Sequence, residues 1–299
     1  MNRHLRRMVA GALLTCASGL ALAGPVILGG DDLTDHGSRS GGANLEGWLY
    51  IQKAVGNILS SSTRGGAITT DIVALGSAAN ATFSSGNAGG AIGSAADVLG
   101  KTVTFIDGAA AIDQFFLDLA AGLINPDMLW IAGTGAANDL DASEGLALSG
   151  NAAAINAFGA SGGGIMSHGS GTIAYGWLSA LLPGLTEVSG CNSSGATLTA
   201  AGNAAFPGLS NSDVDSNAGP CHSHFTGDFG GLTTLAFDGL GRSYIIGGGA
   251  GTVIRCGGPG EPPCPTPEPD SLPLVALAGV GLLAQQWRRR THRSGKSAT

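Results

Sequence analysis

The chain has 299 residues, of which 52 are glycine and 12% are charged, while 43% are hydrophobic. That hydrophobic content argues against a disordered chain. Residues 24–270 contain six Lys and Arg and all 21 Asp and Glu, so this body carries a formal charge of −15. Phosphate groups would be repelled by it, which argues against nucleic acid and anionic lipid as partners. The negative charge of the body is compatible with calcium binding, or it serves only to keep a lysine-poor protein soluble.

Residues 1–23 have the three parts of a secretory signal peptide. A positively charged start is followed by an apolar run over residues 9–22. A cleavage site with small residues, Ala21-Leu22-Ala23, comes at its end. The positive charges of the start are those of Arg3, Arg6 and Arg7. We therefore predict that the chain is exported and that residues 1–23 are removed. The alternative is a retained anchor helix, for which this run is short, because a span takes roughly 20 residues.

The first apolar run of the body, Pro25 to Gly29, is followed closely by acidic residues. Asp31, Asp32 and Asp35 lie within five residues of one another. Strand ends are where α/β folds collect ligands, and carboxylate oxygens are the ligands that calcium prefers. The pattern predicts a calcium site at these three residues, with Asp139 on the same edge of the sheet. The alternative is that the carboxylates cap helices and keep a loop solvated.

The body as a whole, residues 24–256, predicts an α/β domain. Five short apolar runs bounded by Gly or Asp predict strands buried on both faces. They begin at Pro25, Asp71, Thr102, Met128 and Gly164. Three segments between them predict helices, at residues 47–59, 109–123 and 143–158. Alternating strands and helices predict a mostly parallel sheet that is covered on both faces. A late antiparallel pair is expected at residues 244–247 and 252–254.

The middle of the body resembles a known enzyme family. Leu129-Trp-Ile-Ala-Gly-Thr-Gly predicts a strand that ends in a glycine turn, a helix follows to Phe158, and Gly-Gly leads into Ser167-His168-Gly169-Ser170-Gly171. This order, together with residues 198–209, is similar to the class I glutamine amidotransferase-like family. The resemblance implies a flavodoxin-like three-layer sandwich. It also implies a sharp turn after the last of these strands, where that family carries a nucleophilic Cys.

The sequence departs from that family at the sharp turn, because no Cys is present there. Gly169 supplies no nucleophile, and Ser170 comes one position late. We therefore expect the family's fold without its activity, and we assign no catalytic residue. The alternative is a secreted hydrolase or amidase-like enzyme in which Ser167 or Ser170 acts with His222 or His224.

Four cysteines remain after Cys16 leaves with the signal peptide. An even number of cysteines in an exported protein predicts two disulfides. Three pairings are possible, and proximity favours Cys191 with Cys221 and Cys256 with Cys264. A zinc site is the alternative, since histidines flank Cys221, but the other cysteines lack the C-x-x-C spacing of zinc ligands.

The end of the chain has three consecutive parts. Residues 257–266 are a Pro-rich linker, which cannot form a helix or a central strand. An apolar run over residues 272–284 follows, and it predicts a single transmembrane helix. Arginines come next, and positive residues after such a helix stay in the cytoplasm. They are Arg288, Arg289, Arg290 and Arg293.

This tail, residues 267–293, resembles the PEP-CTERM sorting signal of Gram-negative bacteria. The tripeptide Pro267-Glu268-Pro269 stands just before the apolar helix and the arginines. The resemblance implies that an exosortase, a membrane cysteine transpeptidase, recognises the tripeptide and cleaves the chain. Residues 294–299 would then be a cytoplasmic tail. An ordinary C-terminal anchor after a Pro-rich linker is the alternative.

These features together predict an exported protein that its C-terminal helix holds at the inner membrane until it is cleaved. The cleaved product would move to the cell envelope or to an extracellular matrix, with exopolysaccharide or matrix as a possible partner. We expect a body without catalysis and without a cofactor other than calcium. The two competing hypotheses are the secreted hydrolase and a calcium-dependent adhesive module.

Overall fold

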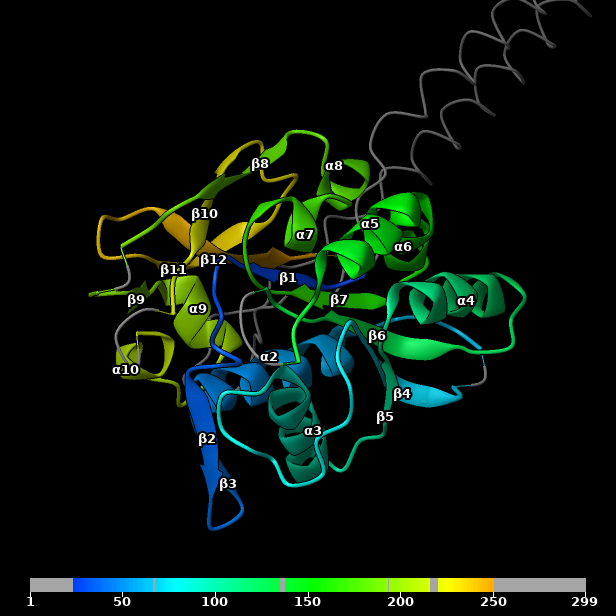
Figure 1. Cartoon of the computed structure of the whole chain (residues 1–299). Helices are drawn as coiled ribbons and strands as arrows, with labels where there is room; N and C mark the ends of the chain where they lie inside the picture. The colour runs from blue at the N-terminus through cyan, green and yellow to red at the C-terminus, as the bar shows by residue number, and fades with distance from the viewer. Residues whose placement is uncertain (1–23, 67, 135–137, 193, 216–219, 250–299) are drawn as a thin grey trace, which may run out of the picture. The chain divides into compact units, whose positions relative to one another are not determined.

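The apolar runs of the sequence form the parallel strands at the centre of the protein. The computed structural model describes residues 24–66, 68–134, 138–192, 194–215 and 220–249. Within them, five parallel strands lie in the order β5-β4-β6-β7-β1 (Figure 1). They are β1 (Val26–Gly29), β4 (Thr70–Leu75), β5 (Val103–Ile106), β6 (Pro126–Ile131) and β7 (Gly164–Ser167). All five lie where the sequence predicts strands, because continuous apolar runs suit a sheet that is covered on both faces.

Three antiparallel strands extend the sheet beyond β1, so that it has eight strands and is mostly parallel. These are β12 (Ser243–Gly248), β11 (Thr233–Phe237) and the short β9 (Thr197–Leu198). Strand β1 pairs with β7 on one side and with β12 on the other, with Ile27 opposite both Met166 and Gly247. Because β1 has partners on both sides, its carboxyl end lies inside the molecule rather than at an edge.

Helices cover both faces of the sheet. On one face α2 (Gly47–Ser61) packs against α3 (Ala88–Leu99) and the centre of the sheet. On the other face lies a continuous group of helices that pack on one another (Figure 1). They are α4 (Ala109–Ala120), α5 (Ala142–Gly150), α6 (Ala152–Ala160), α7 (Gly171–Tyr175) and α8 (Leu178–Leu181). The two layers bury Trp48, Trp130 and Trp177 completely.

Two small sheets and two short helices complete the described residues. Strand β2 (Gly37–Ser40) pairs with β3 (Ala43–Glu46), and β8 (Leu185–Ser189) pairs with β10 (Ser223–Gly227). Helices α9 (Ala200–Ala205) and α10 (Asn211–Val214) pack against α2. Strand β10 also packs against β12, which brings the residues just before β10 close to the carboxyl end of β1.

The structure corrects three details of the predicted elements. The helix predicted at residues 143–158 is two helices, α5 and α6, which meet at Asn151. Helix α3 was not predicted, because its sequence is rich in glycine and alanine and has few large apolar residues. Strand β12 forms where one strand of the late pair was expected, but its described partners are β1 and β11. Residues 252–254 lie outside the described residues.

Within the described part of the chain, no helix is both long and apolar enough to cross a bilayer. The predicted signal peptide at residues 1–23 and the predicted helix of the tail lie outside it.

The packing of α5 on α7 gives a matched pair of glycine variants within one helix. A Cβ added at Gly145 would lie 2.8 Å from the Cα of Ile173, whereas one added at Gly150 would have nothing within 4 Å. Because a forced backbone shift costs ~1–3 kcal/mol, Gly145→Ala should lower the free energy of unfolding by that amount. Gly150→Ala should leave it unchanged or raise it by up to about 1 kcal/mol, because alanine favours helix. Urea denaturation measures both, and equal effects of the two variants would contradict this packing.

Candidate functional site

The candidate site begins at the turn that follows β1, where two consecutive glycines allow the chain to fold tightly. A Cβ at Gly29 would lie 1.6 Å from Oδ2 of Asp31, so the carboxylate occupies the space that a side chain would need. A Cβ at Gly30 would lie 2.0 Å from the carbonyl oxygen of Ser223. The Gly30 carbonyl accepts hydrogen bonds from the backbone N–H groups of His222 and Ser223, at 2.7 and 3.0 Å. Glycine is therefore required at both positions by close approach of other groups.

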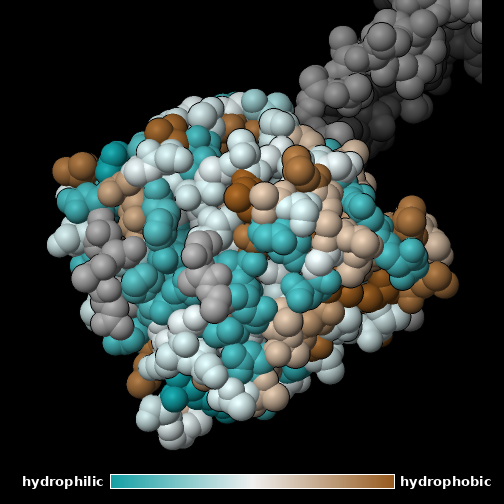
Figure 2. All heavy atoms as spheres, in the orientation of Figure 1, coloured by the Kyte–Doolittle hydropathy of each residue, from teal (hydrophilic) through white to brown (hydrophobic). Residues whose placement is uncertain are grey.

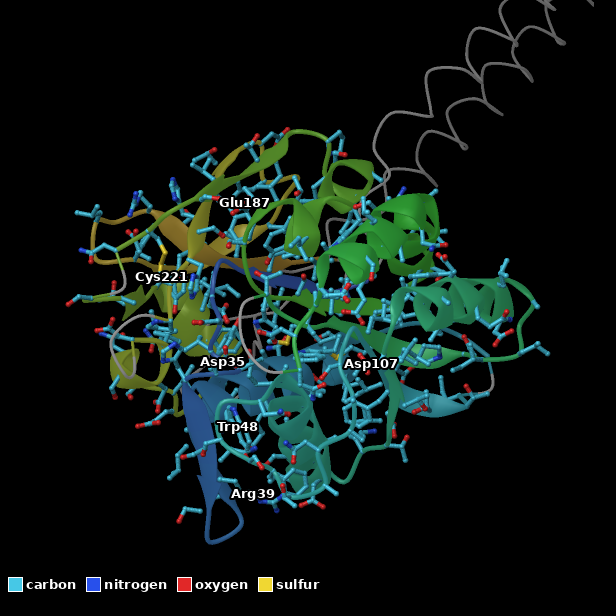
Figure 3. All side chains as sticks on the ribbon, in the orientation of Figure 1. Asp35, Arg39, Trp48, Asp107, Glu187 and Cys221 are labelled. Carbon is cyan, nitrogen blue, oxygen red and sulfur yellow. A yellow bond between two sulfur atoms is a disulfide. The ribbon has the colours of Figure 1, made fainter. Side chains whose placement is uncertain are left out.

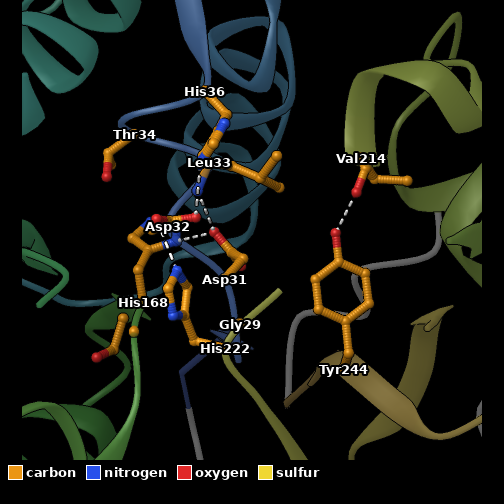
Figure 4. A network of polar contacts seen from close by, with 12 residues as sticks. Gly29, Asp31, Asp32, Leu33, Thr34, His36, His168, Val214, His222 and Tyr244 are labelled. Carbon is orange, nitrogen blue, oxygen red and sulfur yellow. Dashed lines mark hydrogen bonds and ion pairs between the residues drawn. The ribbon is translucent and has the colours of Figure 1, made fainter. Parts of the chain in front are cut away.

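The innermost part of the site is a buried pair between Asp31 and His168. Both side chains are completely buried, and Nδ1 of His168 lies 2.9 Å from Oδ1 of Asp31 (Figure 4). The indole N–H of Trp130 donates to Nε2 of His168 at 3.2 Å. Because an indole N–H can only donate, Nε2 is the acceptor and the proton sits on Nδ1, facing the carboxylate. The ends of β1, β6 and β7 are thus joined by one chain of hydrogen bonds.

Tyrosine side chains surround this pair. The hydroxyl of Tyr175 donates to the carbonyl oxygen of Gly29 at 2.7 Å, and Tyr50 presents its ring to His168 with centroids 6.3 Å apart. Burial, followed by the negative charge of Asp31, raises the pKa of both phenols well above its usual value. Both tyrosines therefore remain neutral, and the pair is enclosed by uncharged groups.

The next carboxylate, Asp32, lies between two histidines nearer the surface. Its Oδ2 is 2.7 Å from Nε2 of His222, and its Oδ1 is 3.3 Å from Nε2 of His36 (Figure 4). The His222 side chain is 43% exposed, whereas that of Asp32 is 11% exposed. The hydrogen bond that Asp32 accepts from His222 raises the pKa of His222. We call Asp32, His36 and His222 the Asp32 clamp, and the imidazole of His222 is its most exposed side chain.

A disulfide holds the segment that carries His222, just before β10. The structure joins Cys191 to Cys221, which is the pairing that proximity favoured for these two residues (Figure 3). Cys221 forms an isolated antiparallel bridge with Asp31, and the backbone N–H of Asp32 donates to the carbonyl oxygen of Pro220 at 2.8 Å. The disulfide therefore fixes the chain segment that presents His222 to the Asp32 clamp.

A third part of the site, which we call the Asp35 corner, consists of Thr34, Asp35 and Asp139 beside Gly133. A Cβ at Gly133 would lie 3.7 Å from Oδ1 of Asp139, 3.8 Å from Oγ1 of Thr34 and 3.6 Å from Cβ of His168. Burial and the nearby charges of Asp139 and Asp32 raise the pKa of Asp35 to about 7. Side-chain oxygens of Thr34 and Asp139, from the segments after β1 and β6, thus both lie near Gly133, as does the Cβ of His168.

The three carboxylates predicted to bind calcium take different places. Asp31 pairs with His168, Asp32 pairs with His222 and His36, and Asp35 lies in the Asp35 corner. Across the described ranges, no three His, Cys, Asp or Glu side chains are grouped so that they could hold a metal ion. Calcium at this edge of the sheet stays a prediction, and Asp139 does lie on that edge, as the sequence indicated.

The turn after β7 does not present a serine to a histidine. Ser167 is completely buried, and Ser170 is the residue that precedes α7. His224 contacts the carbonyl oxygen of Gly190 through Nδ1 at 2.7 Å, while His222 is held by Asp32. Among the described contacts, no hydrogen bond links either serine to either histidine.

Sequence reasoning missed Trp130 and Thr34, because each looks like part of an apolar run or a loop when it is viewed alone. His168 was not assigned a role from the sequence, yet it is the partner of Asp31, which lies 137 positions away in the sequence. The other predicted functional residues, Pro267, Glu268, Pro269, Cys256 and Cys264, lie outside the described residues. No protein family, curated protein or solved structure matches this chain.

The raised pKa of Asp35 predicts how stability changes with pH. Its value is about 7 in the folded protein against a usual 3.8, so the folded state holds this proton more tightly. The resulting stability is fully present below about pH 4 and is lost as the pH rises through about 7. In chelator-treated protein, Asp35→Asn should therefore raise the melting temperature at pH 8 and change it little at pH 4. The expected rise is about 2–4 °C, which corresponds to roughly 1 kcal/mol in a domain of this size.

The matched control for this prediction is Asp107→Asn, which removes an exposed carboxylate after β5 on the same edge of the sheet. It should shift the melting temperature equally at both pH values. If Asp35→Asn shifted the melting temperature equally at both pH values, as the control should, the pKa of Asp35 would not be raised in the folded protein.

Proposed function

We propose that this chain is an exported cell-envelope or extracellular-matrix protein that an exosortase sorts and cleaves. Its body would be a non-catalytic binding or structural domain on a flavodoxin-like sandwich. The observation that supports a non-catalytic body is the environment of His168. This histidine directly precedes Gly169, the position at which an amidotransferase-like enzyme would carry its nucleophile; it is completely buried, and both of its ring nitrogens are engaged. A side chain in that state can neither attack a substrate nor accept a proton from one.

The sorting part of the proposal rests on the tail. Pro267-Glu268-Pro269, an apolar run and a cluster of arginines stand in the order of a PEP-CTERM signal. The apolar segment would hold the chain in the inner membrane, with the body outside the cytoplasm, until the exosortase cuts it. The disulfide between Cys191 and Cys221 supports export, because disulfides persist in oxidising compartments.

The charge and surface of the body fit a protein that works outside the cell. Six basic side chains against 21 acidic ones make nucleic acid an unsuitable partner. Hydrophilic residues gather across the middle of the face shown in Figure 2, while apolar residues gather at its right, over α4. An exopolysaccharide or another uncharged matrix component would meet no electrostatic barrier at such a surface. We propose this class of partner for the body.

A secreted hydrolase is the second candidate, and the Asp32 clamp is the observation that favours it. His222 is hydrogen-bonded to a carboxylate at 2.7 Å and is 43% exposed, which is an arrangement that general bases use. What the described residues lack is a serine or cysteine bonded to this imidazole.

Hydrolysis assays separate the two candidates. On our proposal, the purified protein and its His222→Asn variant hydrolyse nitrophenyl esters and peptide anilides at the same background rate. His224→Asn serves as the matched control, because His224 is held by a backbone carbonyl rather than by a carboxylate. A rate more than tenfold above that of His222→Asn, retained in His224→Asn, would establish the hydrolase instead.

Cleavage of the tail tests the sorting proposal. In cells with an exosortase, Glu268→Ala with Pro267→Ala and Pro269→Ala should leave the full chain in the membrane fraction. The wild-type protein should be shorter by about the residues that follow the tripeptide, as seen by mass spectrometry of the released form. Asp270→Ala removes a neighbouring charge outside the motif and should be processed normally. A wild-type protein that keeps its last residues in such cells would refute the proposal.

A further inference from the structure

Strand β5 is the end strand of the large sheet, and among the described residues only β4 pairs with it. All four residues of β5 are only partly buried, whereas β1 and β7, which have the same length, are buried throughout. The carbonyl oxygens of Thr102, just before β5, and of Ile106 accept hydrogen bonds from β4 and the residue after it, at 3.0 and 2.8 Å. Alternate residues of a strand turn their N–H and C=O groups to opposite sides, so those of Val103 and Phe105 point away from the sheet.

The opposite edge of the sheet is protected, but β5 has none of the features that protect an edge. At the opposite edge β9 has only two residues, and the N–H of Leu198 donates to Oδ1 of Asn211 at 2.9 Å. Proline, charged side chains or a bulge keep an edge strand from pairing with another chain. The sequence of β5, Val-Thr-Phe-Ile, contains neither proline nor charge, and its pairing with β4 has no register shift. The edge of β5 can therefore pair with a further strand.

Two opposite charges flank β5 and indicate which strand that is. Lys101 lies two residues before the strand and Asp107 directly after it, and both are exposed. Nζ of Lys101 is 3.0 Å from Oδ1 of Asp71, while Asp107 makes no ion pair among the described residues. In a parallel arrangement of two copies, each charge would meet its like. In an antiparallel arrangement, each charge meets its opposite.

We propose that two copies of this chain form a dimer in which their β5 edges pair antiparallel about a two-fold axis at Thr104. Only residues whose N–H and C=O groups point outward can bond across this edge, which restricts the register to steps of two residues. With Thr104 opposite itself, Val103 bonds with the partner's Phe105, and Lys101 lies opposite the partner's Asp107. A shift by two residues would instead place Lys101 opposite the partner's Phe105, or Asp107 opposite the partner's Val103.

Side-chain packing agrees with this register. Val103 and Phe105 lie on the same face of the strand, because side chains alternate, so each Val103 meets the partner's Phe105. A β-branched residue opposite an aromatic one is a favourable cross-strand pair, and the two-fold axis makes it twice.

The dimer would join the two eight-stranded sheets into one. Since the strands run in opposite directions across the axis, the two Asp32 clamps would lie at opposite edges of the joined sheet. Two such sites on one particle raise avidity for a repeating partner such as a matrix. This last consequence rests on the proposed binding role, whereas the dimer itself depends neither on that role nor on processing of the tail.

Charge reversal tests the register. The full chain is purified in detergent, and its association is measured by sedimentation equilibrium over a dilution series. We expect a monomer–dimer equilibrium that weakens with added salt. Lys101→Glu and Asp107→Lys each place two pairs of like charges across the axis, so each should raise the dissociation constant about tenfold or more. An equimolar mixture of the two variants should restore the dimer, because every pair is then opposite again.

The matched control for the charge change is Asp228→Lys. Asp228 is exposed and lies between β10 and β11, far from β5 in the strand order. This variant should associate like the wild type.

Cysteine trapping gives a second measurement that does not depend on weakening the dimer. Directly opposite Cβ atoms in antiparallel strands are about 4.5–5.5 Å apart, so under mild oxidation Thr104→Cys should link two copies covalently. The control is Thr233→Cys, an exposed position on β11, which should give only the background of the wild-type cysteines.

Four results would overturn the inference. The first is a wild-type chain that sediments as a monomer at every concentration. The second is a dimer that Lys101→Glu and Asp107→Lys leave at wild-type affinity, which is also what association through the tail would give. The third is a mixture of these two variants that stays monomeric. The fourth is equal cross-linking of Thr104→Cys and Thr233→Cys. Failure of tail cleavage bears on none of these outcomes, so the two proposals fail separately.

Discussion

The buried pair of Asp31 and His168 is the constraint on which the rest of the site depends. Both side chains have lost all contact with water, and breaking such a pair by removing one partner costs about 3–5 kcal/mol. The pair is stable only while β1 and β7 are neighbours and Trp130 supplies its indole N–H from β6. The hydrogen bonds of Asp31, His168 and Trp130 therefore form only when β6, β7 and β1 lie side by side in this order.

The surroundings of the pair follow from this constraint. The carboxylate of Asp31 folds back over Gly29, and the segment that carries His222 approaches Gly30, so both positions exclude a side chain. The disulfide at Cys221 then fixes that segment against the turn after β1. Exposure therefore increases from the completely buried pair of Asp31 and His168, through the Asp32 clamp, to the half-buried Asp35.

This gradient bears on what the body can do. The most protected pair, Asp31 and His168, links the ends of neighbouring strands. Covalent catalysis needs an exposed and activated nucleophile, and neither of these two buried side chains is exposed.

The sequence by itself determined the parallel strands, because a strand buried on both faces needs a continuous apolar run, and five such runs are present. It also indicated the edge of the sheet where polar residues gather, since Asp31, Asp32 and Asp139 follow strands. The predicted export and sorting signals are equally local, because each is a pattern of consecutive residues. Helix α3 and the break at Asn151 escaped prediction, since small residues leave the helical pattern weak.

Only the tertiary structure decided which carboxylate meets which partner. Asp31 and His168 are 137 positions apart, and Asp32 and His222 are 190 positions apart. Three aspartates within five residues look equivalent along the chain, yet Asp31 is buried against His168, Asp32 lies between two histidines, and Asp35 is half-buried with a raised pKa. The three aspartates differ in where their side chains point and in how deeply they are buried. Both properties depend on the order of the strands, which no local sequence pattern specifies.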